Sequence, residues 1–123
     1  MSQVIPNITV QSKKLVLDNE KLRRANAKVT TATAYKKGDL LTLSDANVLT
    51  HAVDEKTWDV ICGQDVTAAE ATIKAADGIE IPVYYGGVFN VEAVSLNGAL
   101  LTTAQYDAAR AKATKNKIEL SKV

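Results

Sequence analysis

Residues 58–94, WDVICGQDVTAAEATIKAADGIEIPVYYGGVFNVEAV, carry the clearest secondary-structure signals in the chain. Three runs within them are rich in β-branched and aromatic side chains: residues 60–62, 79–85 and 88–94. Such side chains favour a pleated, half-buried surface, so we expect three strands. Gly86 and Gly87 separate the last two runs and predict a hairpin turn. Residues 67–76 are rich in alanine and compatible with a helix, but we expect a strand end and a loop there.

The rest of the chain shows the same pattern of short apolar runs between turn residues. The candidate strands outside the first stretch are residues 14–17, 29–33, 40–43, 48–53 and 118–123. Short strands at intervals of roughly eight to twelve residues indicate an all-β or mostly-β fold. A chain of 123 residues is expected to form a single domain. We predict that this domain covers residues 14–123 and follows an N-terminal segment of residues 1–13.

One helix is predicted near the C-terminus. Thr102 and Gln105 have the spacing of a capping box, in which each side chain bonds the backbone of the other residue. Residues 104–113 contain strong helix formers, and Ala109 and Ala113 fall on one face. The fold class that we predict is therefore mostly β with one short helix.

The composition leaves little material for a large core. Aromatic residues make up only 5% of the chain, and oligomerisation is a common way for a small domain to gain buried surface. Trp58, Tyr84 and Tyr85 are candidate subunit contacts, because aromatic side chains are enriched at interfaces. Tyr84 and Tyr85 are neighbours in a predicted strand and must point to opposite faces, so only one of them can fill the same core.

Few residues suit catalysis or metal binding. Cys62 is the single cysteine and His51 the single histidine, which excludes an internal disulfide and the common metal motifs. We expect Cys62 to be a small buried residue and His51 to lie on a strand. Asp54 and Asp59 lie near His51 in the sequence, but a polar loop explains them. We expect no enzymatic activity, no catalytic residue, no cofactor and no metal.

Charge is distributed unevenly along the chain. Residues 1–30 contain six cations and two anions, whereas residues 31–123 contain nine cations and twelve anions. Basic N-terminal segments are typical of interaction arms. The cations alternate with apolar residues and lack stacking aromatics, so we expect no nucleic-acid partner. No apolar run approaches the roughly 20 residues that span a bilayer, and no secretory signal is evident, so we expect no membrane partner.

The first twelve residues are uncharged and β-prone. Val4, Ile8 and Val10 would share one face of an extended strand, and Pro6 suits an edge strand. Such a segment either pairs with its own sheet or adds to the sheet edge of a partner.

The order of motifs in the C-terminal two thirds resembles the lambda-type bacteriophage head decoration proteins. The residues that carry the resemblance are KGDLL (37–41), VICGQDV (60–66), IPVYYGGVFN (81–90), the short helix and IELS (118–121). The resemblance implies a β-clip-like fold and a homotrimer. It also implies a place on the outer surface of the virion, which assembles in the host cytoplasm.

In that family, trimers bind the outside of the expanded head at three-fold and quasi-three-fold sites, where they contact the major capsid protein and stabilise the shell against DNA pressure. The resemblance implies a flexible N-terminal arm at residues 1–13 that adds a strand to the capsid. The arm residues that we expect to bind are Gln3, Val4, Ile5, Pro6, Asn7, Ile8, Thr9 and Val10. The candidate trimer interface is Trp58, Tyr84 and Tyr85.

Two alternatives remain. Residues 37–41 also suggest a sugar- or ligand-binding module of the β-clip or SAF type, which would need a pocket with convergent polar groups. A trimeric β-clip nucleotide hydrolase is the third choice, but the sequence lacks the metal and uracil site that it would need.

Overall fold

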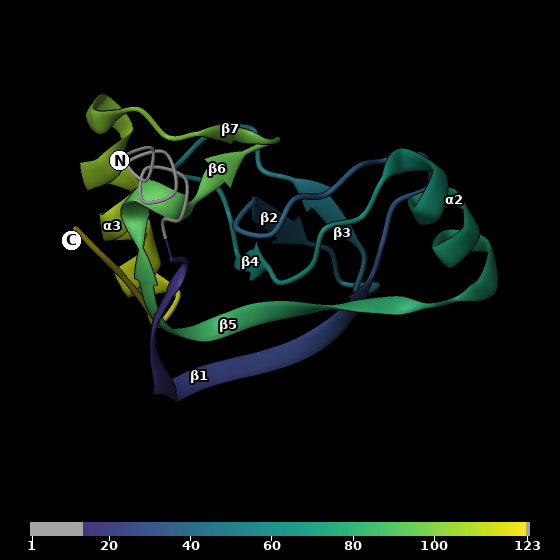
Figure 1. The fold of residues 1–123 in the computed structure, drawn as a ribbon, viewed down its shortest axis with the longest axis horizontal. Helices are drawn as coiled ribbons and strands as arrows, with labels where there is room; N and C mark the ends of the chain where they lie inside the picture. Colours follow the sequence, from purple (N-terminus) through teal and green to yellow (C-terminus); the bar gives the residue numbers. More distant parts are fainter. Residues whose placement is uncertain (1–13, 123) are drawn as a thin grey trace, which may run out of the picture.

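Strand β5 (Glu80–Asn90) runs along the length of the molecule and pairs with three other strands (Figure 1). The computed structural model describes residues 14–122. β1 (Val16–Lys28) lies antiparallel along one side of β5. β4 (Val60–Cys62) lies antiparallel and β8 (Ile118–Ser121) parallel to it. β5 is therefore the strand on which the rest of the sheet is built.

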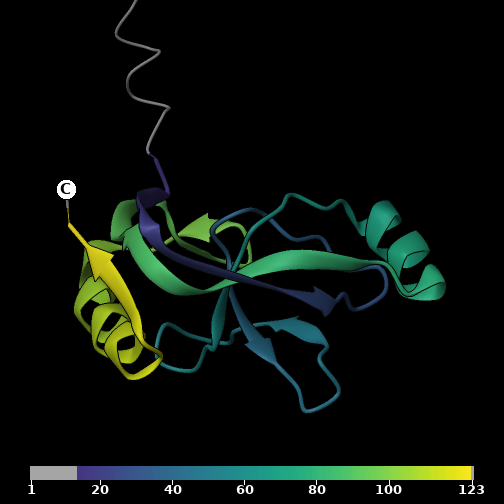
Figure 2. The ribbon, with the colours of Figure 1, turned by 90° about the horizontal axis from the view of Figure 1, so that it is seen from below.

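The sheet continues from β4 and then curls back on itself. Its order is β1-β5-β4-β2-β3, with β2 at Leu40–Leu43 and β3 at Leu49–His51. Lys28 at the end of β1 forms a bridge with Val48, just before β3, so the last strand returns to the first. Figure 2 shows β2 and β3 on one side of the long β1–β5 ribbon. The predicted mostly-β class is confirmed.

Short elements and a helix complete the end of the body where β5 finishes. They are η1 (Val91–Ala93), β6 (Ser95–Leu96), β7 (Ala99–Leu100) and α3 (Thr103–Lys115). α3 begins with the predicted capping box, because Gln105 accepts a bond from the Thr102 backbone N–H at 2.9 Å. Ala109 and Ala113, predicted to share one face with Tyr106, are fully buried, and Tyr106 packs against the same cluster. The C-terminal helix and the closing strand β8 are both confirmed.

A second helix, α2 (Ala68–Asp77), replaces the predicted strand end and loop. Thr67 and Glu70 form a reciprocal capping box, and Gly78 ends the helix in the left-handed conformation at φ 70°. These end signals and the alanine-rich interior outweigh the strand preference of Ile73, whose side chain is 60% exposed. The expectation of a single helix was wrong. The β-clip assignment stays a prediction.

The predicted hairpin at Gly86 and Gly87 was also wrong, because β5 continues through both residues. The pairing with β1 changes register here, so β1 bulges past the glycines. A Cβ at Gly86 would lie 3.2 Å from the Arg23 side chain, and one at Gly87 would lie 3.2 Å from Leu22 Cδ1. The glycines therefore serve the close approach of β1 rather than a reversal of the chain.

Strand β1 was only partly predicted. It extends far beyond the expected residues 14–17, whereas residues 29–33, expected as a strand, form a turn. The Thr30 N–H donates to the Tyr35 hydroxyl at 2.8 Å, and the Thr30 hydroxyl donates to the Leu49 carbonyl at 2.8 Å. These bonds fold the segment around Tyr35 instead of extending the ladder.

The buried side chains form two clusters on the two sides of the sheet. One contains Phe89, Tyr84 and the buried face of α3, and the other contains Leu41, Val83 and the buried alanine of α2. All three residues of β4 are buried, because this strand lies between the clusters. The described part of the predicted domain is thus one sheet with a core on each side.

The close approach at Gly87 predicts a specific loss of stability. Gly87 has φ 134°, where other residues are strained, and a Cβ would also meet Leu22 and Phe89. We expect Gly87→Ala to lower the free energy of unfolding by about 2–5 kcal/mol, measured by chemical denaturation. The matched control is Gly98→Ala, at φ 87° with no atom within 4 Å of the new Cβ, which should cost about 1 kcal/mol. Equal losses would contradict this account.

Candidate assembly surface

The three aromatic residues predicted as subunit contacts lie in different environments. Trp58 is 1% exposed and donates its indole N–H to the Glu55 carbonyl at 3.0 Å. Tyr84 is 5% exposed and packs against Phe89, with ring centroids 5.3 Å apart. Both side chains are already covered within one chain, so their assignment to the interface was wrong. Tyr85 points to the other face and is 45% exposed, as the alternation predicted for one of the pair.

Tyr85 borders a surface groove of about 990 Å³. We call it the Tyr85 groove. Its floor is formed by β5, one wall by β1, and the other by the end of α3 and the start of β8. The residues that line it are Glu20, Lys21, Arg23, Tyr85, Gly86, Gly87, Val88, Thr114, Asn116, Lys117, Ile118 and Glu119. It is open to solvent.

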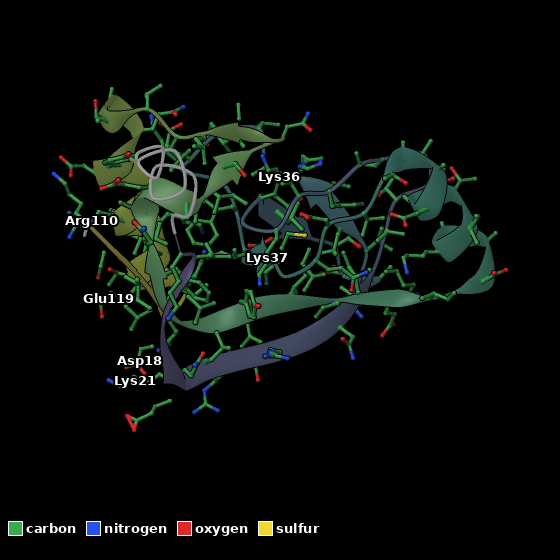
Figure 3. The ribbon with its side chains drawn as sticks, in the orientation of Figure 1. Asp18, Lys21, Lys36, Lys37, Arg110 and Glu119 are labelled. Atoms are coloured by element: carbon green, nitrogen blue, oxygen red, sulfur yellow. The ribbon has the colours of Figure 1, made fainter. Side chains whose placement is uncertain are left out.

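The charges of the groove lie around its rim. Lys21 and Glu119 come from opposite walls and lie toward the same end of the molecule in Figure 3. Within residues 14–122, none of the lysine, arginine or glutamate side chains of the groove forms an ion pair with another described residue. These charged side chains can therefore pair with a partner. A groove with an apolar centre and a charged rim has the layout that protein interfaces share.

A buried carboxylate, that of Asp39, lies between the start of β2 and β6. Asp39 is 1% exposed, and its Oδ1 accepts bonds from the Ser95 hydroxyl and from the Gly98 N–H at 3.0 Å. Its Oδ2 accepts the Lys36 N–H at 2.9 Å. The carboxylate thus satisfies three donors and joins the turn before β2 to the β6–β7 hairpin, which lies far away in the sequence.

His51 lies beside this carboxylate. Its Nδ1 is 3.8 Å from Asp39 Oδ2, its Nε2 is 2.7 Å from the Ala34 carbonyl, and its ring stacks on Tyr35 at 5.2 Å. Ser95 donates to Asp39 rather than to His51, and its side chain is 2% exposed. Ser95, His51 and Asp39 therefore lack the hydrogen bond from a serine nucleophile to a histidine base that serine hydrolases use. Sequence spacing gave no signal for this cluster, because its members lie on separate elements.

Cys62 is the buried residue that the sequence predicted. It is fully buried, and burial raises the pKa of its thiol to about 11. Its Sγ donates to the Gln64 carbonyl at 3.0 Å. A thiol with this pKa is neutral near pH 7 and is a poor nucleophile.

The acidic residues near His51 in the sequence form a loop. Asp54 accepts bonds from the Lys56 N–H at 2.8 Å and the Thr57 hydroxyl at 3.0 Å, and the pKa of this exposed carboxyl is lowered, first by the Lys56 bond. Among residues 14–122, no group of three or more histidine, cysteine or acidic side chains is arranged to hold a metal ion. No helix in the same range has the length and apolar character to cross a bilayer.

The predicted capsid-binding residues, Gln3 to Val10, lie outside the described residues. The point from which they extend is well defined. Leu15 is 9% exposed and packs in the core, and its carbonyl accepts the Asn90 N–H at 2.8 Å. Lys14, the preceding residue, is exposed. The N-terminal segment is thus attached to the body at the end of β5.

No protein-family model matches the chain, and a search of curated proteins found no match.

The carboxylate of Asp39 predicts a large effect on stability. Asp39→Ala leaves three donors without an acceptor, two of them backbone N–H groups, so we expect the free energy of unfolding to fall by about 3 kcal/mol or more. The control is Asp65→Ala, which removes one exposed bond to the Lys37 N–H and should cost less than about 1 kcal/mol. Denaturant titration measures both, and a small effect for Asp39→Ala would contradict the proposed role.

The burial of Cys62 predicts slow thiol chemistry. The folded pKa of about 11 lies above the ordinary thiol value of 9.0. The neutral thiol therefore favours the folded state below pH 9, and this contribution is lost as the pH rises through about 11. We expect no reaction with Ellman's reagent at pH 8 in the native protein and one equivalent in denaturant. Native labelling at the rate of the unfolded chain would show that the thiol is accessible.

Proposed function

We propose that the protein is a viral capsid decoration, or cement, protein. It binds as a homotrimer to the major capsid protein on the outside of the expanded head, at three-fold and quasi-three-fold sites. There it stabilises the shell against the pressure of packaged DNA. The mostly-β body and the order of motifs around β5 support this proposal, and residues 1–13 act as the capsid-binding arm.

The observation that carries the proposal is the fixed position of Leu15, close after the proposed arm in the sequence. Leu15 is held in the core and by the Asn90 N–H at the end of β5. An uncharged, β-prone segment that starts there can add a strand to an open sheet edge of a neighbouring protein. This arrangement separates two tasks: the arm binds the capsid, and the body holds three arms together.

The energetics favour binding through several arms at once. Ordering one arm costs about 1–2 kcal/mol per residue in backbone entropy before contacts repay it. Three arms on one rigid trimer bind as a unit, and avidity exceeds the affinity of one arm by roughly 10²–10⁴. A trimer that binds only the expanded lattice then stabilises that lattice by mass action.

A small-ligand module is the second candidate, and the size of the Tyr85 groove favours it. The volume of about 990 Å³ is within the range of ligand pockets. A soluble sugar or nucleotide bound there would protect the protein against thermal unfolding and perturb the signals of Tyr85 and Val88. Decoration predicts no such effect.

Co-sedimentation tests the function directly. The full-length protein is mixed with expanded and with unexpanded heads assembled from the major capsid protein of the same genome. We expect saturable binding in multiples of three to expanded heads and little to unexpanded ones, because only the expanded lattice presents the sites. Equal binding to both, or to neither, would contradict the proposal.

Deleting residues 1–12 tests the arm. We expect the deleted protein to keep the oligomeric state and melting temperature of the full chain, and to lose capsid occupancy by at least tenfold. Scrambling the order of the same residues is the matched control for composition, and it should also lose occupancy. Unchanged occupancy after the deletion would remove the arm from the mechanism.

A further inference from the structure

We propose that the subunits associate head to tail, with the outer face of α2 of one protomer lying in the Tyr85 groove of the next. This inference rests on the proposed homotrimer and names the surfaces that form it. The partner is a second copy of this chain, and the occupant of the groove is its helix α2.

The outer face of α2 is apolar, and no element within residues 14–122 covers it. It consists of Ala69, Ile73 and Ala76, which follow each other at helical spacing, and it is extended by Ile79 after the helix. Ile73 is 60% and Ile79 44% exposed, whereas Ala71 on the opposite face is fully buried. The helix therefore exposes its largest apolar side chain and buries a small one, the reverse of the pattern of a helix that has only its own core to cover.

The Tyr85 groove offers a partly apolar surface to such a helix. Arg23 and Leu22 of β1 lie over Gly86 and Gly87 in its floor, and Val88 and Ile118 add apolar lining. Ala69 and Ala76 flank Ile73 with small side chains, so the helix backbone can come near the floor. Tyr85, 45% exposed at the edge of the groove, is the kind of aromatic anchor that interfaces favour.

The charges of the two surfaces are of opposite sign. On and beside α2 lie three carboxylates, Glu70, Asp77 and Glu80, and two cations, Lys74 and the Lys28 that pairs with Glu80 in the β1–β5 ladder. On the groove rim lie three cations and two carboxylates: Lys21, Arg23, Lys117, Glu20 and Glu119. An acidic helix end thus meets a mildly basic groove, and this complementarity favours contact between unlike surfaces over contact between two copies of the same surface.

The two surfaces lie at opposite ends of the body. α2 is at one end of the long axis, and Lys21 and Glu119 of the groove lie toward the other end, near α3 (Figures 1 and 3). They cannot meet within one protomer, so each copy offers one free surface of each kind. Contacts between unlike surfaces are heterologous and close into a ring when the rotation permits, and a three-fold ring satisfies every copy.

Substitution of each surface tests the proposal. The full-length Ile73→Asp and Tyr85→Asp proteins are examined by light scattering over a range of concentrations, with circular dichroism melting to show that each folds. Lys21→Glu is a milder second variant of the groove. We expect each to raise the concentration needed for assembly by at least about tenfold. Leu100→Asp is the matched control, since Leu100 is 59% exposed on β7, and it should assemble like the unaltered protein.

Mixing the two defective proteins gives the decisive result. Ile73→Asp keeps an intact groove and Tyr85→Asp keeps an intact α2 face, so the mixture should form a dimer that neither protein forms alone. This dimer cannot close into a ring, so it lacks the added stability of the closed trimer. The mixture is therefore measured at high concentration. A mixture that stays monomeric, or either variant assembling like the unaltered protein, would overturn the proposed contact.

Head binding separates this inference from the proposed function. If the variants assemble normally and the trimer binds expanded heads, the contact is wrong and decoration stands. If the substitutions and the mixture behave as expected but the assembled protein ignores heads, the contact stands and decoration is wrong.

Discussion

The pairing of β5 on both of its edges is the constraint on which the structure depends. β1 occupies one edge, and β4 and then β8 occupy the other, so segments from the start, middle and end of the chain meet on one strand. The two buried clusters lie on the two faces of the sheet that this strand organises. Because the proposed arm and the Tyr85 groove are both attached to β5, their relative positions follow from the same pairing.

Local signals in the sequence identified the elements with well-marked ends. The Thr102–Gln105 capping box and the alternating residues of β8 were sufficient to predict both elements. The same reasoning would have found α2, since Thr67 and Glu70 form an equivalent box and Gly78 ends the helix. There the β-branched Thr72 and Ile73 were given too much weight, although an exposed helix face tolerates them.

The interpretation of Gly86 and Gly87 required tertiary information. A pair of glycines between two strand-like runs favours a turn, and only the bulge of β1 shows that these residues leave space for Arg23 and Leu22. Long-range contacts also explain why Asp39, Ser95 and His51 were not recognised as a cluster. For the aromatic residues, alternation predicted that Tyr84 and Tyr85 differ, but it did not show which was exposed. Trp58 packs in the buried cluster that contains Ala109 and Ala113 of α3, a contact distant in sequence.

The polar cluster and the exposed surfaces have different roles in the proposed function. Asp39 satisfies buried donors and ties the turn before β2 to the β6–β7 hairpin, which holds these segments in place. Rigidity matters because a cement protein transmits force between its neighbours, and a body that deforms would lose the avidity of its arms. Apolar and charged side chains at the two ends then remain for assembly. This division explains how a small domain with few aromatics can act as a structural link.

The path of β5 through Gly86 and Gly87 is tested most directly by NMR on the full-length protein. The structure predicts nuclear Overhauser contacts between Gly86 and Arg23 and between Gly87 and Ile118, because β5 pairs with β1 and β8 at these positions. Backbone contacts between Tyr85 and Val88 across a tight turn, without those to Arg23 and Ile118, would show a hairpin and contradict the account.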